Sequence, residues 1–372
     1  MKIPPFLLER YFAKYEFNAP YLLSPSDCEP FTLQEMLEMA SPKSRQLWER
    51  LWLGYTESQG LPALREAIVS LYDNLSAADI LTLVPEEGIF IAMNVLLEPG
   101  DHVVTTFPAY QSLYQIAKSS ACRVSSWLPR FDGGRAVFEL SDLEALLEDN
   151  TRLLVINFPN NPTGALPDRQ TFERLMSLAE ERGITVFSDE MYRGLEYQPE
   201  QRLPSVCERL KNAVSLSGVS KTYSLPGLRI GWLATRDEQL YDQLATFKDY
   251  TTICSSAPGE ILSLIALQNS EQIIKRNLDI ISSNLDLLDN FFANYPELFK
   301  WQRPQAGSIA FPEYIGPGTV DDLCAELIEA QGVMLAPGSA FDFPGSRFRV
   351  GFGRRNLPEA LLRLKTFLND RR

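Results

Sequence analysis

Histidine and cysteine, two residue types that often bind metal ions, are scarce in this chain. The 372 residues include one histidine, His102, and five cysteines. A single histidine excludes a histidine-rich metal site, and we interpret His102 as a strand-edge residue rather than as the base of a Ser-His-Asp triad. The cysteines form no CxxC pair and are widely spaced, so we expect no disulfide framework, no metal site and a reducing compartment. They are Cys28, Cys122, Cys207, Cys254 and Cys324.

Positive charge is also in short supply. Thirty-five Lys and Arg residues stand against 48 Asp and Glu residues, which gives a net charge of -13. Binding to nucleic acid or to an anionic membrane needs clustered Lys and Arg, so neither is expected as a partner. No uncharged apolar run is long enough to span a membrane, and residues 1–17 lack the apolar core of a secretory signal. We therefore expect a cytoplasmic protein.

The chain has no internal repeat and no low-complexity linker, and its middle alternates between two kinds of hydrophobic period. This alternation predicts an α/β protein whose parallel strands are joined by helical crossovers. We expect helices at 59–75, 88–97, 140–148 and 171–182, and strands at 102–106, 122–128, 152–157, 184–188, 213–217 and 230–234. A long helix over 260–294, a strand-like region over 301–312 and a mixed α+β segment over 320–372 follow.

Four chemically capable side chains follow the predicted strands. Tyr110, Asn161, Asp189 and Lys221 each come just after a strand ends. Ligands of open α/β sheets bind beyond the carboxyl ends of the strands. We therefore interpret these residues together as one site.

The segment over 217–232, SGVSKTYSLPGLRIGW, carries the strongest single indication of chemistry. Lys221 lies among small and hydroxyl residues, which let a ligand approach the backbone, and an amine in such a place can form a Schiff base with a carbonyl. Arg229 can bind a phosphate through its two-pronged guanidinium group. Pyridoxal 5'-phosphate (PLP) carries both an aldehyde and a phosphate. The segment resembles the PLP-lysine signature of class I/II aminotransferases of fold type I, the aspartate aminotransferase-like superfamily.

This resemblance, which extends from about residue 55 to residue 353, implies a two-part fold. The larger part is a PLP-binding domain over 50–275, with a mostly parallel seven-stranded sheet between helices. The smaller α+β domain combines residues 1–49 with residues 276–372.

The resemblance also implies roles around the cofactor. In DEMY (189–192), Asp189 holds the pyridine nitrogen protonated and Tyr192 hydrogen-bonds the phenolic oxygen. In NFPNNPTG (157–164), Asn161 donates to the same oxygen, and Tyr110 in FPAY (107–110) stacks on the ring. Lys221 forms the Schiff base and moves the proton between the substrate Cα and the cofactor.

Phosphate and carboxylate contacts complete the implied site. Arg229 binds the phosphate with Ser217 or Ser220, and Tyr55 reaches the phosphate of the neighbouring subunit, which requires a homodimer. Arg349, in RFRVGFG (347–353), binds the substrate carboxylate. Strand alternation puts Arg347 on the same side, so spacing alone leaves both arginines open.

Two places depart from the family pattern. The turn that normally binds phosphate through backbone N–H groups reads TLVPEEG (82–88), in which Pro85 has no N–H and Glu86 and Glu87 are acidic. A glycine, Gly218, stands where the family usually has a hydroxyl. We expect a reshaped phosphate cup that includes Pro85 and Glu86. The two carboxylates are either helix-capping groups or a selector for a polar or cationic substrate.

The N-terminal loop SPSDCEPF (24–31) adds acidity where the family usually carries a substrate loop with glycine or asparagine. Asp27 is a candidate substrate contact, and with Glu29 it favours an amino acid that has a basic side chain.

The resulting hypothesis is an aminotransferase that moves the amino group of an L-amino acid to a 2-oxo acid, through a Schiff base on Lys221 and the pyridoxamine form of the cofactor. Two alternatives stay open: a PLP-dependent lyase or cyclase, and an inactive binding protein on the same scaffold. A dinucleotide-binding enzyme is discounted because no GxGxxG follows the first strand.

Overall fold

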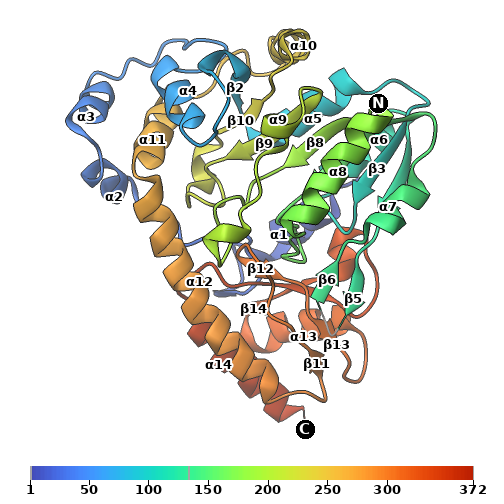
Figure 1. The fold of residues 1–372 in the computed structure, drawn as a ribbon. Coiled ribbons are helices and arrows are strands. Elements are labelled where there is room, and N and C mark those ends of the chain that lie inside the picture. Colours follow the sequence, from blue (N-terminus) through green and yellow to red (C-terminus); the bar gives the residue numbers. More distant parts are fainter. Residues whose placement is uncertain (1, 133–134, 372) are drawn as a thin grey trace.

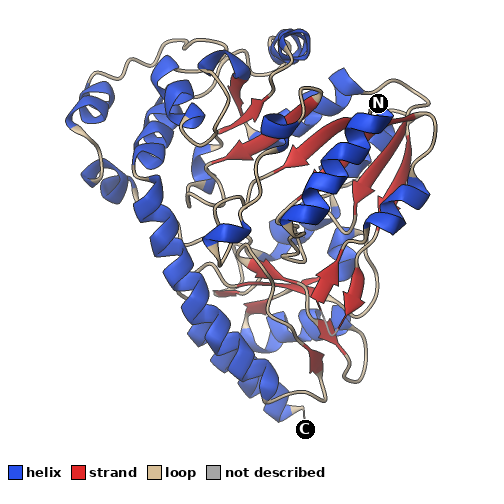
Figure 2. Ribbon diagram, viewed as in Figure 1, coloured by secondary structure: helices blue, strands red, loops and turns tan. Residues whose placement is uncertain are grey.

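The computed structural model describes residues 2–132 and 135–371, and its centre is a seven-stranded sheet (Figure 2). The strand order is β2-β10-β9-β8-β7-β3-β4. In chain order these strands are β2 (Ile80–Leu83), β3 (His102–Thr106), β4 (Arg123–Trp127), β7 (Thr151–Asn157), β8 (Thr185–Asp189), β9 (Ala213–Gly218) and β10 (Gly231–Ala234).

All neighbouring strands from β9 to β4 pair in parallel, and β10 runs antiparallel to both β9 and β2. The register aligns Asn157 at the end of β7 with Asp189 at the end of β8. The carboxyl ends of the parallel strands therefore meet at one edge, as the sequence predicted. The mostly parallel seven-stranded sheet is confirmed.

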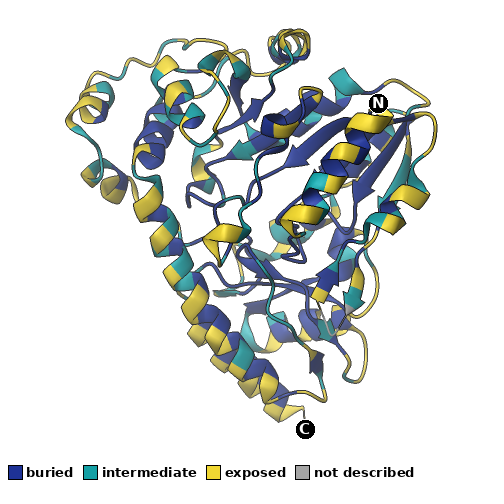
Figure 3. Ribbon diagram, in the orientation of Figure 1, coloured by how far each residue is buried: buried dark blue, intermediate teal, exposed yellow. Residues whose placement is uncertain are grey.

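Helices cover both faces of this sheet. Apolar side chains of α5 (Pro85–Leu96), α6 (Ser112–Ser119) and α10 (Glu238–Lys248) pack on one face. Those of α7 (Leu140–Leu146), α8 (Arg169–Arg182) and α9 (Val206–Arg209) pack on the other. Figure 3 shows the strands buried and the outer face of α8 exposed. This arrangement is the expected consequence of strands that are apolar on both faces.

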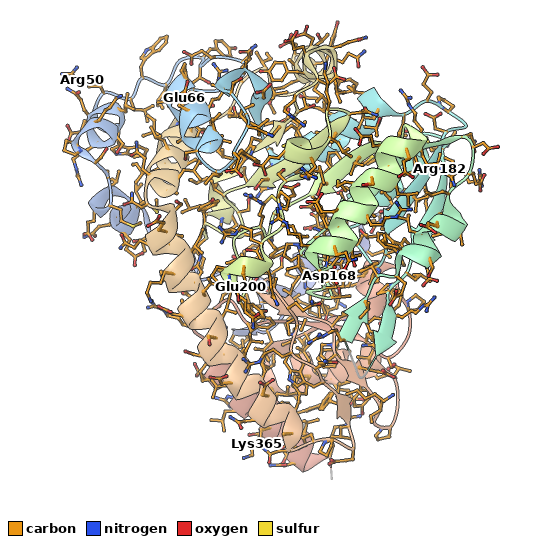
Figure 4. All side chains as sticks on the ribbon, in the orientation of Figure 1. Arg50, Glu66, Asp168, Arg182, Glu200 and Lys365 are labelled. Carbon is orange, nitrogen blue, oxygen red and sulfur yellow. The ribbon has the colours of Figure 1, made fainter. Side chains whose placement is uncertain are left out.

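Helix α8 shows how local sequence sets an element's ends. The Asp168 side chain accepts a hydrogen bond from the Thr171 amide at 2.7 Å, which caps the first turn. Gly183, with a φ of 65°, ends the helix in the left-handed region. Asp168 and Arg182 lie at opposite ends of the helix (Figure 4), where their charges complement its dipole.

The remaining α-helices and strands lie before β2 or after α10 in the chain, except β5 and β6, which lie between β4 and α7. The helices are α1 (Leu7–Tyr15), α2 (Leu33–Glu38), α3 (Pro42–Glu49), α4 (Pro62–Val69), α11 (Ala257–Gln268), α12 (Ser270–Ala293), α13 (Val320–Gln331) and α14 (Leu357–Asp370). The short strands are β1 (Tyr21–Leu22), β5 (Arg130–Asp132), β6 (Arg135–Val137), β11 (Phe299–Lys300), β12 (Ile309–Ala310), β13 (Glu313–Tyr314), β14 (Val333–Met334), β15 (Ala336–Pro337) and β16 (Phe348–Gly351).

The N-terminal and C-terminal segments meet directly. β1 pairs in parallel with β14, and Leu23 and Cys28 share a buried cluster with α13 and α14. Helices α2 and α3 instead pack against α11. Helix α12 runs as one continuous element from the sheet-bearing part to the lower end of the molecule (Figure 1). The domain limits 1–49, 50–275 and 276–372 stay a prediction.

Several element predictions need correction. The helix expected over 260–294 is interrupted at Asn269, whose side chain donates to the backbone oxygens of Met39 and Ile265. The region 301–312 is largely irregular and contains only the two-residue strand β12. Pro304 and Pro312 cannot donate to a ladder, which limits strand formation there. Strand β2 had not been expected at all.

Candidate active site

A cavity of about 480 Å³ lies at the carboxyl edge of the sheet. Its walls also include residues of α1, of the loop after β1 and of β16. All of the predicted site residues except Ser217 and Tyr55 line it: Asp27, Pro85, Glu86, Tyr110, Asn161, Asp189, Tyr192, Ser220, Lys221, Arg229 and Arg349. The structure thus brings together groups from both ends and the middle of the chain.

Lys221 lies in the turn between β9 and β10. Its Nζ donates to Ser26 Oγ at 2.7 Å. Burial lowers the pKa of the Lys221 amine, Asp27 opposes this, and Arg349 and Arg229 add to it. A lowered pKa increases the neutral, nucleophilic fraction of the amine.

The lysine turn is held by α12, which the sequence analysis did not foresee. Ser224 adopts a φ of 61°, a strained value for a residue with a side chain. Asn277 Nδ2 donates to Ser224 Oγ at 2.8 Å and to the Thr222 carbonyl oxygen at 3.0 Å. An asparagine on the buried face of an amphipathic helix is a signal that could have indicated this role.

Asp189 ends β8 inside the cavity. Burial raises its pKa to about 6, while the Met191 amide, which donates to Oδ1 at 3.1 Å, and Lys221 act in the opposite direction. Asn157 connects this residue to the next loop: its Nδ2 donates to the Asp189 carbonyl oxygen and its Oδ1 accepts from the Asn161 amide. The aspartate and Asn161 are therefore positioned by one shared side chain.

Two tyrosines face the cavity in different ways. The buried Tyr192 hydroxyl makes no hydrogen bond of standard geometry within the described part of the chain. Ser26 nevertheless lies close enough to oppose the rise that burial causes in the pKa of Tyr192. Tyr110 donates from its hydroxyl to Glu9 Oε1 at 2.8 Å, and its ring lies 4.8 Å from that of Phe6. Helix α1 and the residues before it thus cover Tyr110.

Arg349 of β16 is only 2% exposed. Its Nε donates to the Ser24 carbonyl oxygen at 3.0 Å and its Nη1 donates to Asn161 Oδ1 at 3.2 Å. Burial lowers its pKa, yet a guanidinium keeps its proton. Arg347 does not line the cavity: its guanidinium lies 3.5 Å from the Phe131 ring centre and pairs with Glu313 at 3.0 Å.

The strand that carries Arg349 is packed unusually close to the N-terminal loop. A Cβ atom at Gly351 would lie 1.9 Å from the Pro25 oxygen, and one at Gly353 would lie 2.6 Å from the Asp27 oxygen. Only glycine allows this approach. Asn284 Nδ2 of α12 donates to the carbonyl oxygens of Phe352 and Arg354 just beyond the strand.

Carboxylates surround the side of the cavity away from the sheet. Glu9 and Glu16 come from α1 and its C-terminal end, and burial raises the pKa of Glu16. Asp27 lines the cavity but is paired with Arg354, whose Nη2 lies 2.8 Å from Oδ2. Glu29, in contrast, does not line the cavity and accepts from the Arg355 amide.

At the opposite end, the altered turn is tightly packed. A Cβ at Gly218 would lie 3.0 Å from Gly231 Cα and 3.1 Å from Pro85 Cγ, so the proline ring fills space above two glycines. Glu86 lines the cavity and accepts from Ser112. Arg229 is exposed, with a φ of 54°.

Glu87 points elsewhere. It caps the Val84 amide and accepts hydrogen bonds from Thr251 and Thr252. Of the two acidic residues in this turn, Glu86 is therefore the one that lines the cavity.

Ser217 and Tyr55 lie away from the cavity. Leu216 lines it, so alternation along β9 directs Ser217 to the other side, and of the two predicted serines Ser220 is the one in the wall. Tyr55 is 84% exposed and close in sequence to the exposed Trp52 and Leu53.

Comparison with known proteins identifies the family. The family described as "Aminotransferase class I and II" matches residues 28–364. The chain belongs to this family. Capreomycidine synthase of Streptomyces vinaceus is 30% identical over 354 residues, which are 94% of this chain and 90% of that protein. Aspartate aminotransferase of Thermotoga maritima is 30% identical over 332 residues, 85% of this chain and 84% of that protein.

Solved structures give the same assignment. A PLP-dependent aminotransferase from Streptococcus suis has a TM-score of 0.92 and 32% identity, with 100% of this chain and 99% of that chain covered. The PLP-dependent cyclase OrfR has a TM-score of 0.90 and 26% identity, with the same coverage. The chain is therefore a PLP-dependent enzyme of the aminotransferase family.

The cavity fits this cofactor. Its volume is within the range of about 300–1,000 Å³ typical of small-molecule sites. The buried Ser220 hydroxyl has no hydrogen-bond partner among the described residues, and it can bind a phosphate together with the Arg229 guanidinium. Lys221 offers an amine for the aldehyde and Asp189 a carboxylate for the ring nitrogen.

Two further observations concern the described residues. Across residues 2–132 and 135–371, no group of three His, Cys, Asp or Glu side chains could hold a metal ion. None of the helices in this part of the chain is both long and apolar enough to cross a membrane.

Proposed function

We propose that the protein is an aminotransferase that moves the amino group of an L-amino acid to a 2-oxo acid. The observation that carries the proposal is the meeting of Lys221, Asp189 and Arg349 in one cavity. These three groups provide a proton-transfer amine, a partner for the ring nitrogen and an anchor for an α-carboxylate. The same groups argue against the inactive alternative.

Bound PLP supplies an electron sink for the charge left at the substrate Cα when a bond there breaks. Asp189 in its ionised form would keep a proton on the ring nitrogen of the cofactor. Asn161 and Tyr192 would donate to its phenolic oxygen, and Tyr110 would lie against its ring. Arg349 holds the α-carboxylate bidentately, which orients the amino acid.

Lys221 then moves the proton. Its amine would take a proton from the substrate Cα as a general base and would then give it up as a general acid. The lowered pKa of this amine suits the first step, because the neutral form is the base. Helix α1 covers the cavity and would exclude water from the negative charge left at the substrate Cα.

We also propose a homodimer. Trp52, Leu53 and Tyr55 form an exposed apolar segment at 78%, 80% and 84% exposure, respectively. Tyr55 would reach the phosphate site of the partner subunit. Tyr55→Phe should then weaken PLP binding without changing the sedimentation of the dimer. A wild-type protein that sediments as a monomer would contradict the proposed homodimer.

The five cysteines are all free, and this supports a reducing, cytoplasmic location.

One observation favours a second candidate, a lyase or cyclase acting on an amino acid with a basic side chain. Glu9 and Glu16 line the same cavity as Lys221. A cationic side chain would be stabilised there. The name of one similar protein, PLP-dependent cyclase OrfR, supports a cyclase reaction as the second candidate.

The deciding experiment is an absorption titration with PLP, followed by a panel of amino acids. The wild type should show a visible band of the bound cofactor that Lys221→Ala lacks and that the surface control Lys211→Ala keeps. A stoichiometric 2-oxo acid formed from one amino acid without a second substrate supports transamination. A product that keeps its amino nitrogen after losing a leaving group supports a cyclase, and a 2-oxo acid formed with free ammonia over many turnovers supports a lyase. No lysine-dependent band would contradict both.

The substrate class is tested within the same panel. Arginine and citrulline are nearly isosteric, but only arginine is cationic. If Glu9 and Glu16 select a cation, arginine should bind at least about tenfold more tightly, and Glu9→Gln with Glu16→Gln should abolish the difference. Equal binding of the two would reject the basic-substrate hypothesis.

A further inference from the structure

The phosphate end of the cavity has few side-chain donors. Pro85, at the first helical position of α5, has no N–H. Ser220 and Arg229 are the neighbouring donors in the cavity wall, and Arg229 already donates to the Pro226 carbonyl oxygen at 3.0 Å. One more donor at this end would compensate for the proline.

Glu86 is the side chain next to this gap. It forms part of the wall of this cavity and also of an apolar cavity of about 460 Å³ on its other side. Ser112, which lies toward the apolar cavity, donates to Glu86 Oε2 at 3.1 Å. None of the described residues donates to Oε1, so one oxygen of the carboxyl group is held and the other is available to a ligand.

The charges that face Glu86 are mostly negative. Glu9 of α1 and Asp189 of β8 raise its pKa, and Arg229 lowers it. Tyr110 also interacts with it across the cavity. On α10, Lys248 interacts with Glu87 rather than with Glu86.

The balance of these effects makes the neutral form of the Glu86 carboxyl group accessible near pH 7. Burial is the largest cause and raises the pKa of Glu86 to about 7, even though the Ser112 hydroxyl stabilises the ionised form. A phosphate in the cavity would add up to two negative charges beside it.

We propose that Glu86 binds the cofactor's phosphate as a neutral carboxyl group, so that phosphate binding is coupled to the uptake of one proton by Glu86. The proton comes from solvent, and the only bond formed is the O–H bond. The neutral form has one O–H donor, which replaces the N–H that Pro85 lacks, whereas the ionised form has only acceptors and repels phosphate. The coupling concerns PLP binding and holds whichever reaction the enzyme performs.

The test measures the dissociation constant for PLP between pH 6.5 and 9 for the wild type and Glu86→Gln. The ratio of the wild-type constant to the variant constant should rise about tenfold per pH unit above pH 7, because the wild type alone must gain a proton. The control Glu238→Gln makes the same change in the exposed first turn of α10. The dissociation constant of Glu238→Gln for PLP should equal that of the wild type at every pH.

Proton uptake is a second readout. Calorimetry in buffers of different ionisation enthalpy at pH 8 should show about one more proton taken up per PLP by the wild type than by Glu86→Gln. Ser112→Ala removes a donor that stabilises the ionised carboxylate, so it should raise the pKa of Glu86 and move the loss of affinity to higher pH.

Pyridoxal, which lacks the phosphate, separates an effect on the phosphate from an effect on Lys221. Its wild-type to Glu86→Gln ratio should stay constant with pH. A constant ratio for PLP, or an equal pH dependence for PLP and pyridoxal, would overturn the proposal. So would weaker PLP binding by folded Glu86→Gln at every pH.

Discussion

The contact between Gly351 and the N-terminal loop leads to a prediction that links packing to catalysis. In Gly351→Ala, the new Cβ would lie 1.9 Å from the Pro25 carbonyl oxygen, 1.5 Å short of an ordinary contact at 3.4 Å. The Cβ is fixed rigidly to the Cα and the Pro25 oxygen is a backbone atom, so neither can rotate away. The loop must therefore move away from β16 by more than 1 Å.

This displacement should destabilise Gly351→Ala in two ways. Overpacking costs about 1–3 kcal/mol and the loss of the hydrogen bond from the Gly351 amide to the Leu23 carbonyl oxygen about 1 kcal/mol more. The free energy of unfolding should fall by about 2–4 kcal/mol. The same loop carries Ser26, which contacts Lys221, so a shift of this size should lower kcat/KM by about a hundredfold.

Urea denaturation and the single-turnover rate with the best amino acid of the panel would measure the two effects. Gly227→Ala is a matched control, because a Cβ there meets no atom within 4 Å. Gly351→Ala should still bind PLP, because Asp189 and Ser220 lie on the sheet side of the cavity, away from the N-terminal loop. If Gly351→Ala matched Gly227→Ala in both stability and rate, the argument from close packing would be refuted.

Three further predictions concern other contacts of the cavity. PLP affinity should fall as the pH drops through about 6, because Asp189, whose pKa is raised to about 6, then loses its charge. A pH titration of PLP binding by Asp189→Asn should lack this fall. If the variant kept it, the fall would belong to another group. Asn277→Ala should slow turnover by about ten- to a hundredfold through a loosened lysine turn, whereas Asn290→Ala on the exposed face of α12 should not; equal rates would exclude the positioning role. Arg354→Gln should cost about 3 kcal/mol in urea denaturation because it leaves Asp27 without its ion-pair partner, and Asp27→Asn in the same chain should recover part of that cost; a single variant as stable as the wild type would mean that Asp27 is solvated.

The fold was predictable where local pattern and tertiary packing agree. Strands β3, β7 and β8 are apolar on both faces, which marks buried parallel strands, and their observed limits differ from the predicted ones by at most one residue. The strand predicted over 301–312 was wrong, because the residues there make contacts with distant parts of the chain. Such contacts cannot be read from the local hydrophobic period. Trp301, for example, donates to Asp289 of α12 at 2.6 Å.

The site was predictable where a residue belongs to a contiguous motif, as Lys221, Asp189 and Asn161 do. The roles assigned to these residues remain predictions, while their proximity is observed. Residues that contact the site from a distant part of the chain carry no local sequence signal. Ser26 is 195 positions from Lys221, and Glu9 is 101 positions from Tyr110. Arg347 and Arg349 could not be separated by spacing, because alternation assigns both to one side and only the packing of Phe131 and Asn161 distinguishes them.

Helix α12 gives the cavity a fixed length scale. Asn277 binds the turn that carries Lys221, and Asn284, seven positions on and so on the same face, binds the backbone just after Arg349. Seven residues of α-helix rise about 10.5 Å, a distance that cannot be stretched without breaking backbone hydrogen bonds. The separation between the reacting amine and the carboxylate anchor is therefore set by helical register and not by the loops around the cavity. Redesign for longer or shorter substrates should then keep α12 unchanged and alter α1, because one residue inserted between the two asparagines would turn them about 100° apart.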